Sequence, residues 1–132
     1  MAQISDQQVK QLLDKPNHGV ISTLNDDGSV HSAVVWVGTE GDAVTVNSAE
    51  GRKWPTNLER NPTVSVLVYD QGNPFEYVEV RGKAQKTDGA DEHINALSKK
   101  YIGQDEYPFR RPGEERVKFV VQPDRVRYVN QG

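Results

Sequence analysis

Short segments of alternating apolar residues, separated by tight turns, are the feature that most constrains what this chain can fold into. In 63–69, every second residue is a valine, as in a strand with one buried face. Between 20–24 and 30–37, the sequence Asn-Asp-Asp-Gly is a strong hairpin signal, because Asp-Gly tolerates positive φ. Further β-rich segments are 43–47, 75–85, 116–121 and 126–129. The pattern predicts a mainly β fold of six to seven antiparallel strands, as a barrel or a sandwich.

Three short helices are expected at the periphery of these strands. The first carries an apolar stripe of Val9, Leu12 and Leu13. The second covers 51–60, where Pro55 is tolerated because it falls in the first turn, and the third runs from Gly89 to about Tyr101. Strands and helices do not alternate, and no glycine-rich dinucleotide loop follows the first strand, which argues against a Rossmann enzyme.

The composition narrows the class of protein. The 132 residues fit one domain, 1–132, and a modest hydrophobic content of 35% favours a protein that completes its core by dimerising. The chain has no cysteine, which excludes disulfides and thiolate zinc sites, and its histidines lack metal-ligand spacing, so no metal site is expected. No apolar run approaches the roughly 20 residues of a membrane span, so we expect a cytoplasmic protein without a membrane partner. The net charge of −3 argues against a nucleic-acid partner.

The stretch that begins at Asn47 is the first candidate site. A predicted strand ends in small polar residues, passes a glycine and enters a predicted helix that carries Arg52 and Lys53. Backbone N–H groups, the positive end of the helix dipole and two cations then meet at one point, which suits a phosphate. The alternative is that Ser48 only caps the helix while both cations are solvated.

Two predicted strands carry side chains that a simple core does not require. In 75–85, Phe75 and Tyr77 lie on the face that carries charged residues, which suits a ligand or subunit interface, or else an exposed aromatic pair. In 30–37, both faces are apolar around Val34 and Trp36, so we expect a central strand buried on both sides. One of these sides could face a partner subunit or a flat cofactor, and the alternative is simply a buried strand.

Taken in order, these segments resemble the pyridoxamine 5′-phosphate oxidase-like split β-barrel family, and most closely its branch of deazaflavin-dependent oxidoreductases. The resemblance rests on Gly51-Arg52-Lys53 leading into Asn57-Leu58-Glu59-Arg60-Asn61-Pro62, then Tyr77-Val78-Glu79-Val80-Arg81-Gly82, then Tyr101-Ile102-Gly103. It implies a homodimer with two cofactor sites at the subunit interface, and the deazaflavin coenzyme F420 as the cofactor.

The resemblance also implies which residues bind the cofactor. The phosphate would be held by basic residues after the third strand, and the tricyclic ring would lie along the second strand. The matching positions are Asn47, Ser48, Arg52 and Lys53 for the phosphate, Ser32, Ala33, Val34 and Trp36 for the ring, Asn57 for a polar group near the ring, and Phe75 and Tyr77 for aromatic packing around the site. Trp54 stands where relatives often carry a lysine, which leaves FMN open as an alternative cofactor.

The sequence therefore predicts an F420-dependent reductase that transfers a hydride between the deazaflavin and a small conjugated organic substrate. No acid–base pair stands out, so no catalytic residue is assigned, and this suits a reaction whose chemistry belongs to the cofactor. Two alternatives stay open: an FMN-binding oxidase or flavin reductase, and a non-catalytic flavin or haem carrier, in which His18 or His31 would reach the iron.

Overall fold

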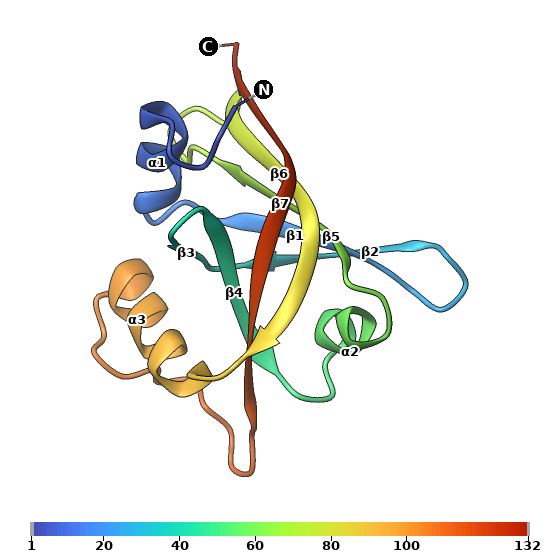
Figure 1. Ribbon diagram of the computed structural model, residues 1–132. Helices are drawn as coiled ribbons and strands as arrows, with labels where there is room; N and C mark the ends of the chain where they lie inside the picture. Colours follow the sequence, from blue (N-terminus) through green and yellow to red (C-terminus); the bar gives the residue numbers. More distant parts are fainter. Residues whose placement is uncertain (1, 132) are drawn as a thin grey trace.

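The computed structural model describes residues 2–131, which form three helices and seven strands (Figure 1). The helices are α1 (Gln7–Asp14), α2 (Lys53–Arg60) and α3 (Ala90–Ile102). The strands are β1 (Gly19–Leu24), β2 (Val30–Val35), β3 (Val37–Glu40), β4 (Ala43–Ala49), β5 (Thr63–Tyr69), β6 (Glu76–Thr87) and β7 (Arg116–Asn130). These elements confirm the predicted mainly β fold with peripheral helices.

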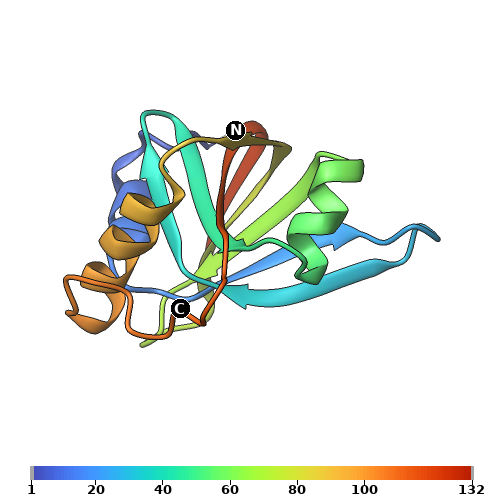
Figure 2. The same cartoon turned by 90° about the horizontal axis from the view of Figure 1, so that it is seen from below.

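All seven strands belong to one sheet with the order β2-β1-β5-β6-β7-β4-β3, and every neighbouring pair is antiparallel. The two edge strands, β2 and β3, are consecutive in the chain and are separated only by Trp36. The sheet must therefore curl until its edges meet at this residue, and the long, bent β6 and β7 follow that curl (Figures 1 and 2). The result is an antiparallel half-barrel, which confirms the expected split β-barrel.

The second predicted strand differs from its expectation in two ways. The segment 30–37 is broken at Trp36, and its first part, β2, is an edge strand and not a central strand buried on both sides. Val30 and Val34 are 64% and 70% exposed. The apolar residues of β2 therefore do not all belong to the core of one chain.

The last strand is longer than predicted. The segments 116–121 and 126–129 were expected to be separate strands, but they form one strand, β7. Pro123 is accommodated because the register with β6 shifts just before Gly82, and irregular positions are where sheets tolerate proline. Glycine is required there, since a Cβ on Gly82 would lie 2.0 Å from the carbonyl O of Gln122. The strand therefore bends where the sequence suggested a break.

The core lies inside the curl of the sheet and consists mainly of valines from alternating strand positions. Val64, Val66 and Val68 of β5 are buried, as their spacing predicted. The predicted apolar stripe of α1 is buried as well, and α2 contributes Trp54 and Leu58 to the same cluster. These contacts fix α2 beside the end of β4, where the candidate site is formed.

Within residues 2–131, no helix is long and apolar enough to cross a bilayer. The cytoplasmic location stays a prediction.

Candidate functional site

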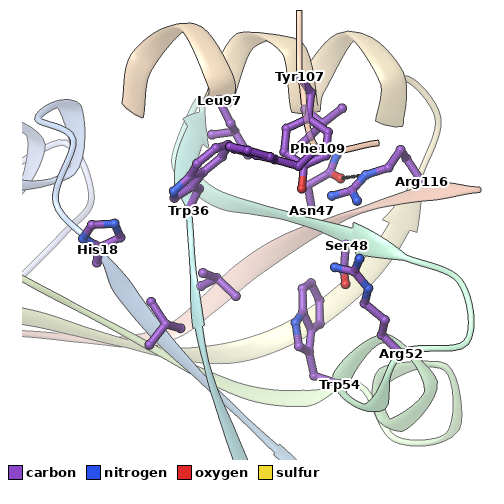
Figure 3. A pocket seen from close by; sticks show the side chains of 13 residues that line it. His18, Trp36, Asn47, Ser48, Arg52, Trp54, Leu97, Tyr107, Phe109 and Arg116 are labelled. Carbon is purple, nitrogen blue, oxygen red and sulfur yellow. Dashed lines mark hydrogen bonds between the residues drawn. The ribbon is translucent and has the colours of Figure 1, made fainter. Parts of the chain in front are cut away.

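An open cavity of about 280 Å³ lies where α3, the end of β4, the start of α2 and the junction of β2 and β3 meet (Figure 3). Thirteen residues line it: His18, Val34, Val35, Trp36, Asn47, Ser48, Arg52, Trp54, Ile94, Leu97, Tyr107, Phe109 and Arg116. Arg52 and Arg116 approach from one side with Ser48 between them, and Trp36 lies on the opposite side. The cavity thus has a basic end and an aromatic wall.

The basic end is assembled by the pairing of β4 with β7 and by the turn into α2. Ala49 pairs with Arg116, so β7 begins beside the last residue of β4. Gly51 has a φ of 89°, and this left-handed turn brings Arg52, the N-cap residue of α2, to the same place. Two arginines far apart in the sequence therefore reach one end of the cavity.

Glu114 lies between the two arginines, although it does not itself line the cavity. Its Oε1 is 3.1 Å from Nη2 of Arg52, and its Oε2 is 3.2 Å from Nη1 of Arg116. The side chains of Glu114 and Arg116 are 6% and 3% exposed, whereas that of Arg52 is 47% exposed. Among the described residues, neither Oε2 of Glu114 nor Nη1 of Arg116 makes a hydrogen bond of good geometry. Arg52 is therefore the accessible cation of this end, and it is ion-paired and not simply solvated.

Asn47 is the centre of a polar network behind the basic end. Nε of Arg116 donates to Oδ1 of Asn47 at 3.0 Å (Figure 3). Nδ2 of Asn47 donates to the carbonyl O of Ala90 at 2.9 Å and to Nδ1 of His93 at 3.0 Å. Because Nδ1 accepts, the neutral ring carries its proton on Nε2, which lies 2.9 Å from Oγ1 of Thr45. Burial lowers the pKa of His93 to about 4, which keeps the ring neutral and the network intact.

The aromatic wall is built around Trp36. Tyr101 of α3 stacks on Trp36, with ring centroids 5.3 Å apart and an interplanar angle of 9°. Tyr107 meets Trp36 edge-on at 5.9 Å, and Phe109 meets Tyr107 edge-on at 5.8 Å. Tyr101 is fixed in turn, because its hydroxyl donates to the carbonyl O of Asn17 at 2.6 Å, and burial raises the pKa of Tyr101 to about 12. The wall therefore offers a flat ligand a fixed apolar surface.

Five of the predicted cofactor-binding residues line this cavity: Val34, Trp36, Asn47, Ser48 and Arg52. They come from the predicted second strand and from the stretch that begins at Asn47, so the fold brings these two segments together. Their roles in binding stay predictions.

Lys53 and Asn57 lie in a different pocket of about 340 Å³, on the side of α2 that faces the β1–β2 hairpin. Asn57 is 2% exposed, and its Nδ2 donates to Oγ1 of Thr23 and to Oδ1 of Asn25, each at 3.0 Å. This side chain ties α2 to the hairpin. Lys53 is separated from Arg52 because neighbouring side chains at the start of a helix point in different directions.

The other four predicted residues are not among the thirteen that line the cavity. The hydroxyl groups of Ser32 and Ser22 are hydrogen-bonded to each other, with 3.0 Å between the two Oγ atoms. Ala33 packs against the core. Phe75 is 64% exposed, and Tyr77 is half-buried in β6. Within one chain these four residues do not reach the cavity, so their role in cofactor binding stays a prediction.

Sequence reasoning missed the part of the lining that comes from His18, Ile94, Leu97, Tyr107, Phe109 and Arg116. The aromatic residues of the 103–115 segment were the available signal for two of them. Ile94 and Leu97 follow the ordinary apolar stripe of a packed helix, and nothing in the local sequence distinguishes Arg116. Trp54, noted only as a departure from relatives, lines the cavity and packs on Phe119 with ring centroids 5.9 Å apart.

The family model for pyridoxamine 5′-phosphate oxidase matches residues 5–130 of the chain. The sequence matches none of the curated proteins with which it was compared.

Solved structures similar to this chain include proteins of different kinds. An F420 reductase is similar over 89% of this chain and 94% of its own, with 27% identity and a TM-score of 0.77. A conserved hypothetical protein from Mycobacterium tuberculosis is similar over 96% of this chain and 84% of its own, with 19% identity and a TM-score of 0.76. A heme binding protein from Mycobacterium smegmatis is similar over 96% of this chain and 56% of its own, with 20% identity and a TM-score of 0.66. The last two likenesses show the fold alone.

Proposed function

Because this chain belongs to the pyridoxamine 5′-phosphate oxidase family, we propose that it is a reductase that binds coenzyme F420 in the cavity beside α3. The observation that carries the proposal is the chemistry of the lining: an aromatic and apolar wall faces two arginines, and within residues 2–131 no acidic side chain lines the cavity. Such a lining suits a planar conjugated ring that carries a phosphate. The similarity to an F420 reductase supports the same cofactor.

The donors at the basic end fit the phosphate of this cofactor. The side chain of Arg52 is half exposed, whereas Nη1 of Arg116 is buried in its ion pair with Glu114. Ser48 lies between the two arginines in Figure 3. Guanidinium and hydroxyl groups are strong donors to phosphate oxygens. Arg52 and Ser48 would hold the phosphate, and the buried Arg116 would support this end of the cavity with its charge.

The aromatic wall fits the ring of the cofactor. When bound, reduced F420 supplies a hydride to an electron-poor, conjugated small molecule. The contribution of the chain is to orient the ring and exclude water, and Trp36 is held for this purpose between Tyr101 and Tyr107. Val34 and Leu97 add apolar surface to the same cavity.

We propose that the chain acts as a homodimer in which the second copy completes the site. The cavity of about 280 Å³ is at the lower end of the range for ligand pockets, about 300–1,000 Å³, so one chain encloses only part of a tricyclic cofactor. Val30, Val34 and Phe75 are each more than half exposed, which leaves apolar surface for a partner. Light scattering at micromolar concentration should give twice the mass of one chain, and a clean monomer would contradict the proposal.

A haem carrier is the second candidate function, because a heme binding protein shares the fold and His18 lines the cavity. The hydrogen bonds of His18 argue against it as an axial ligand. Nε2 of Gln71 donates to the carbonyl O of Pro16 at 3.1 Å and to Nδ1 of His18 at 2.6 Å. The proton of the neutral ring therefore sits on Nε2, the nitrogen that an iron would need without its proton. His31, the other histidine considered, does not line the cavity, so we favour the reductase.

Turnover of reduced F420 tests the proposed function. The protein is mixed with reduced F420 and a panel of conjugated enones and nitroaromatic compounds, and the return of the absorbance of oxidised F420 is followed. We expect oxidation that depends on the protein with at least one class of acceptor, and an unchanged rate in Glu115→Gln, which alters an exposed residue outside the cavity. Oxidation no faster than in protein-free controls, with every acceptor, would contradict the reductase.

A further inference from the structure

Glu114 is a buried acid at the end of the cavity where positive charge is needed. It contacts Arg52 at 3.1 Å and Arg116 at 3.2 Å, and it stands behind both relative to the cavity, because both arginines line the cavity and Glu114 does not. A site that only had to attract anions would bind more tightly without this carboxylate. Its presence therefore points to a choice among anions.

We propose that Glu114 is a specificity-determining residue that limits the basic end to one net positive charge, so that the cavity selects singly charged phosphodiesters over doubly charged phosphomonoesters. The inference rests on the proposed function, since it takes the cavity to be the site of a phosphorylated cofactor.

The net charge of the basic end follows from three side chains. Arg52 and Arg116 are the charged residues among those that line the cavity, and Glu114 pairs with both. Two positive charges and one negative charge leave one positive charge. The nearby Lys118 does not add to this balance, because it is ion-paired with Glu40. A singly charged anion therefore neutralises the site, and a doubly charged anion leaves an uncompensated negative charge.

Burial makes the carboxylate of Glu114 effective at this distance. Its side chain is 6% exposed, so water screens its charge poorly. Two guanidinium groups that both touch Glu114 cannot hold an anion far from that carboxylate. For a charge a few ångströms away, at an effective dielectric constant of about 20, the repulsion by Glu114 weakens binding about tenfold or more for each negative charge on the ligand, relative to a neutral side chain at the same position.

The chemistry of phosphate esters gives this selection a consequence. A phosphomonoester such as FMN carries about 1.5 to 2 negative charges at pH 7, because its second pKa is about 6. A phosphodiester has no second ionisation and carries one charge. The phosphate of F420 links two parts of the cofactor and is a diester, so Glu114 favours F420 over FMN at this position.

A merely structural role of Glu114 has a different signature. If the carboxylate only held the two arginines in place, its removal would weaken the binding of monoesters and diesters by the same factor. If the carboxylate selects by charge, its removal increases the affinity for the monoester relative to the affinity for the diester. The ratio of the two dissociation constants therefore separates these roles.

The test compares ligands that share one ring system: riboflavin, FMN and the cyclic phosphodiester of riboflavin. Their dissociation constants are measured by flavin fluorescence for the wild-type protein, Glu114→Gln and Glu115→Gln, and F420 is titrated in parallel. Glu115→Gln is the matched control, because it makes the same change of charge at an exposed neighbouring residue.

We expect the wild type to bind the cyclic diester about tenfold more tightly than FMN, Glu114→Gln to lose this preference because FMN binding improves, and Glu115→Gln to keep it. An equal ratio in the wild type and Glu114→Gln would overturn the selection by charge, as would a wild type that binds both phosphorylated flavins no better than riboflavin. If one of these two outcomes is found and F420 still binds saturably, the selection by charge fails but the proposed function stands. The failure of the inference can therefore be told apart from the failure of the proposed function.

A second measurement needs no variant and serves if Glu114→Gln does not fold. Between about pH 7.5 and about pH 5.5, FMN gains a proton and becomes mostly singly charged, whereas the cyclic diester does not change. The preference of the wild type for the diester should therefore shrink about fivefold over this range. The titratable histidines nearest the site are His18 in the lining and His93 behind Asn47. The affinity for the cyclic diester, whose own charge does not change, measures any effect of the protein on binding separately. A constant ratio would overturn the inference.

Discussion

The two arginines of the cavity are held in different ways, and the difference separates binding from support. Arg52 comes from the local turn into α2, is 47% exposed and pairs with Glu114. Arg116 comes from the start of β7, is 3% exposed and is fixed by Asn47, by Glu114 and by the ring of Tyr107, which lies 4.9 Å from its guanidinium carbon. A half-exposed side chain can turn to meet a ligand, whereas a buried one mainly holds its neighbours. Substitutions of Arg52 should therefore change affinity, and substitutions of Arg116 should change stability.

The largest expected effect is that of Arg116→Met on stability. The variant removes one partner of the buried Glu114 carboxylate and the donor to Asn47, so we expect the free energy of unfolding to fall by about 3–5 kcal/mol. Urea unfolding measures this change. Arg52→Met is the matched control and should cost less than about 1 kcal/mol, because that ion pair is half exposed. Equal losses in the two variants would break the distinction between the two arginines.

The next effect is the pH dependence of the supporting network. Burial lowers the pKa of His93 to about 4 in the folded protein, below its ordinary value of 6.5. The unfolded chain therefore binds a proton more readily between these values, so stability is complete above about pH 6.5 and is lost as the pH falls towards about 4. The loss should reach up to about 3 kcal/mol in urea unfolding at a series of pH values. His93→Gln can accept from Asn47 without titrating, and it should flatten this dependence; an equally steep profile in the variant would contradict the assignment.

A smaller effect is expected from Arg52→Ala on the affinity for F420. Loss of a charge-assisted contact to phosphate costs about 1.5–3 kcal/mol, which is roughly a 10- to 100-fold weaker binding. Fluorescence titration measures the dissociation constant, and unfolding in urea should show little change. An unchanged affinity would reject Arg52 as the phosphate anchor.

The smallest effect is that of Lys53→Ala. The resemblance to the family assigned Lys53 to the phosphate, but the side chain lies in the pocket beside Asn57 and not in the cavity. We expect less than about a twofold change in the affinity for F420, since charges separated by solvent are screened. A loss as large as that of Arg52→Ala would place the phosphate on the other side of α2.

Local patterns in the sequence predicted much of the fold. The alternating valines of 63–69 define β5, and the apolar stripe of α1 is buried as expected. The division of strands was less accurate: Trp36 interrupts an apolar run because the sheet closes on itself there, and Pro123 does not end β7 because a register shift accommodates it. Both outcomes depend on how distant strands meet, which local propensity does not encode.

In the candidate site, too, local sequence patterns predicted some residues, whereas others depend on how distant segments meet. Arg52 was recognisable because the glycine, the cation and the helix start follow one another in the chain. Arg116 and Glu114 were not, because they reach the site only through the pairing of β4 with β7, and Tyr107 reaches it from the segment after α3. A buried acid between two arginines has no signature in a single sequence.

Titration of the wild-type protein with F420, beside Arg52→Ala and Lys53→Ala, tests the central claim most directly. The account predicts saturable binding in the micromolar range that is about 10- to 100-fold weaker in Arg52→Ala and nearly unchanged in Lys53→Ala. No saturable binding of F420 to the wild type, or binding that Arg52→Ala leaves intact, would contradict the assignment of this cavity as the cofactor site.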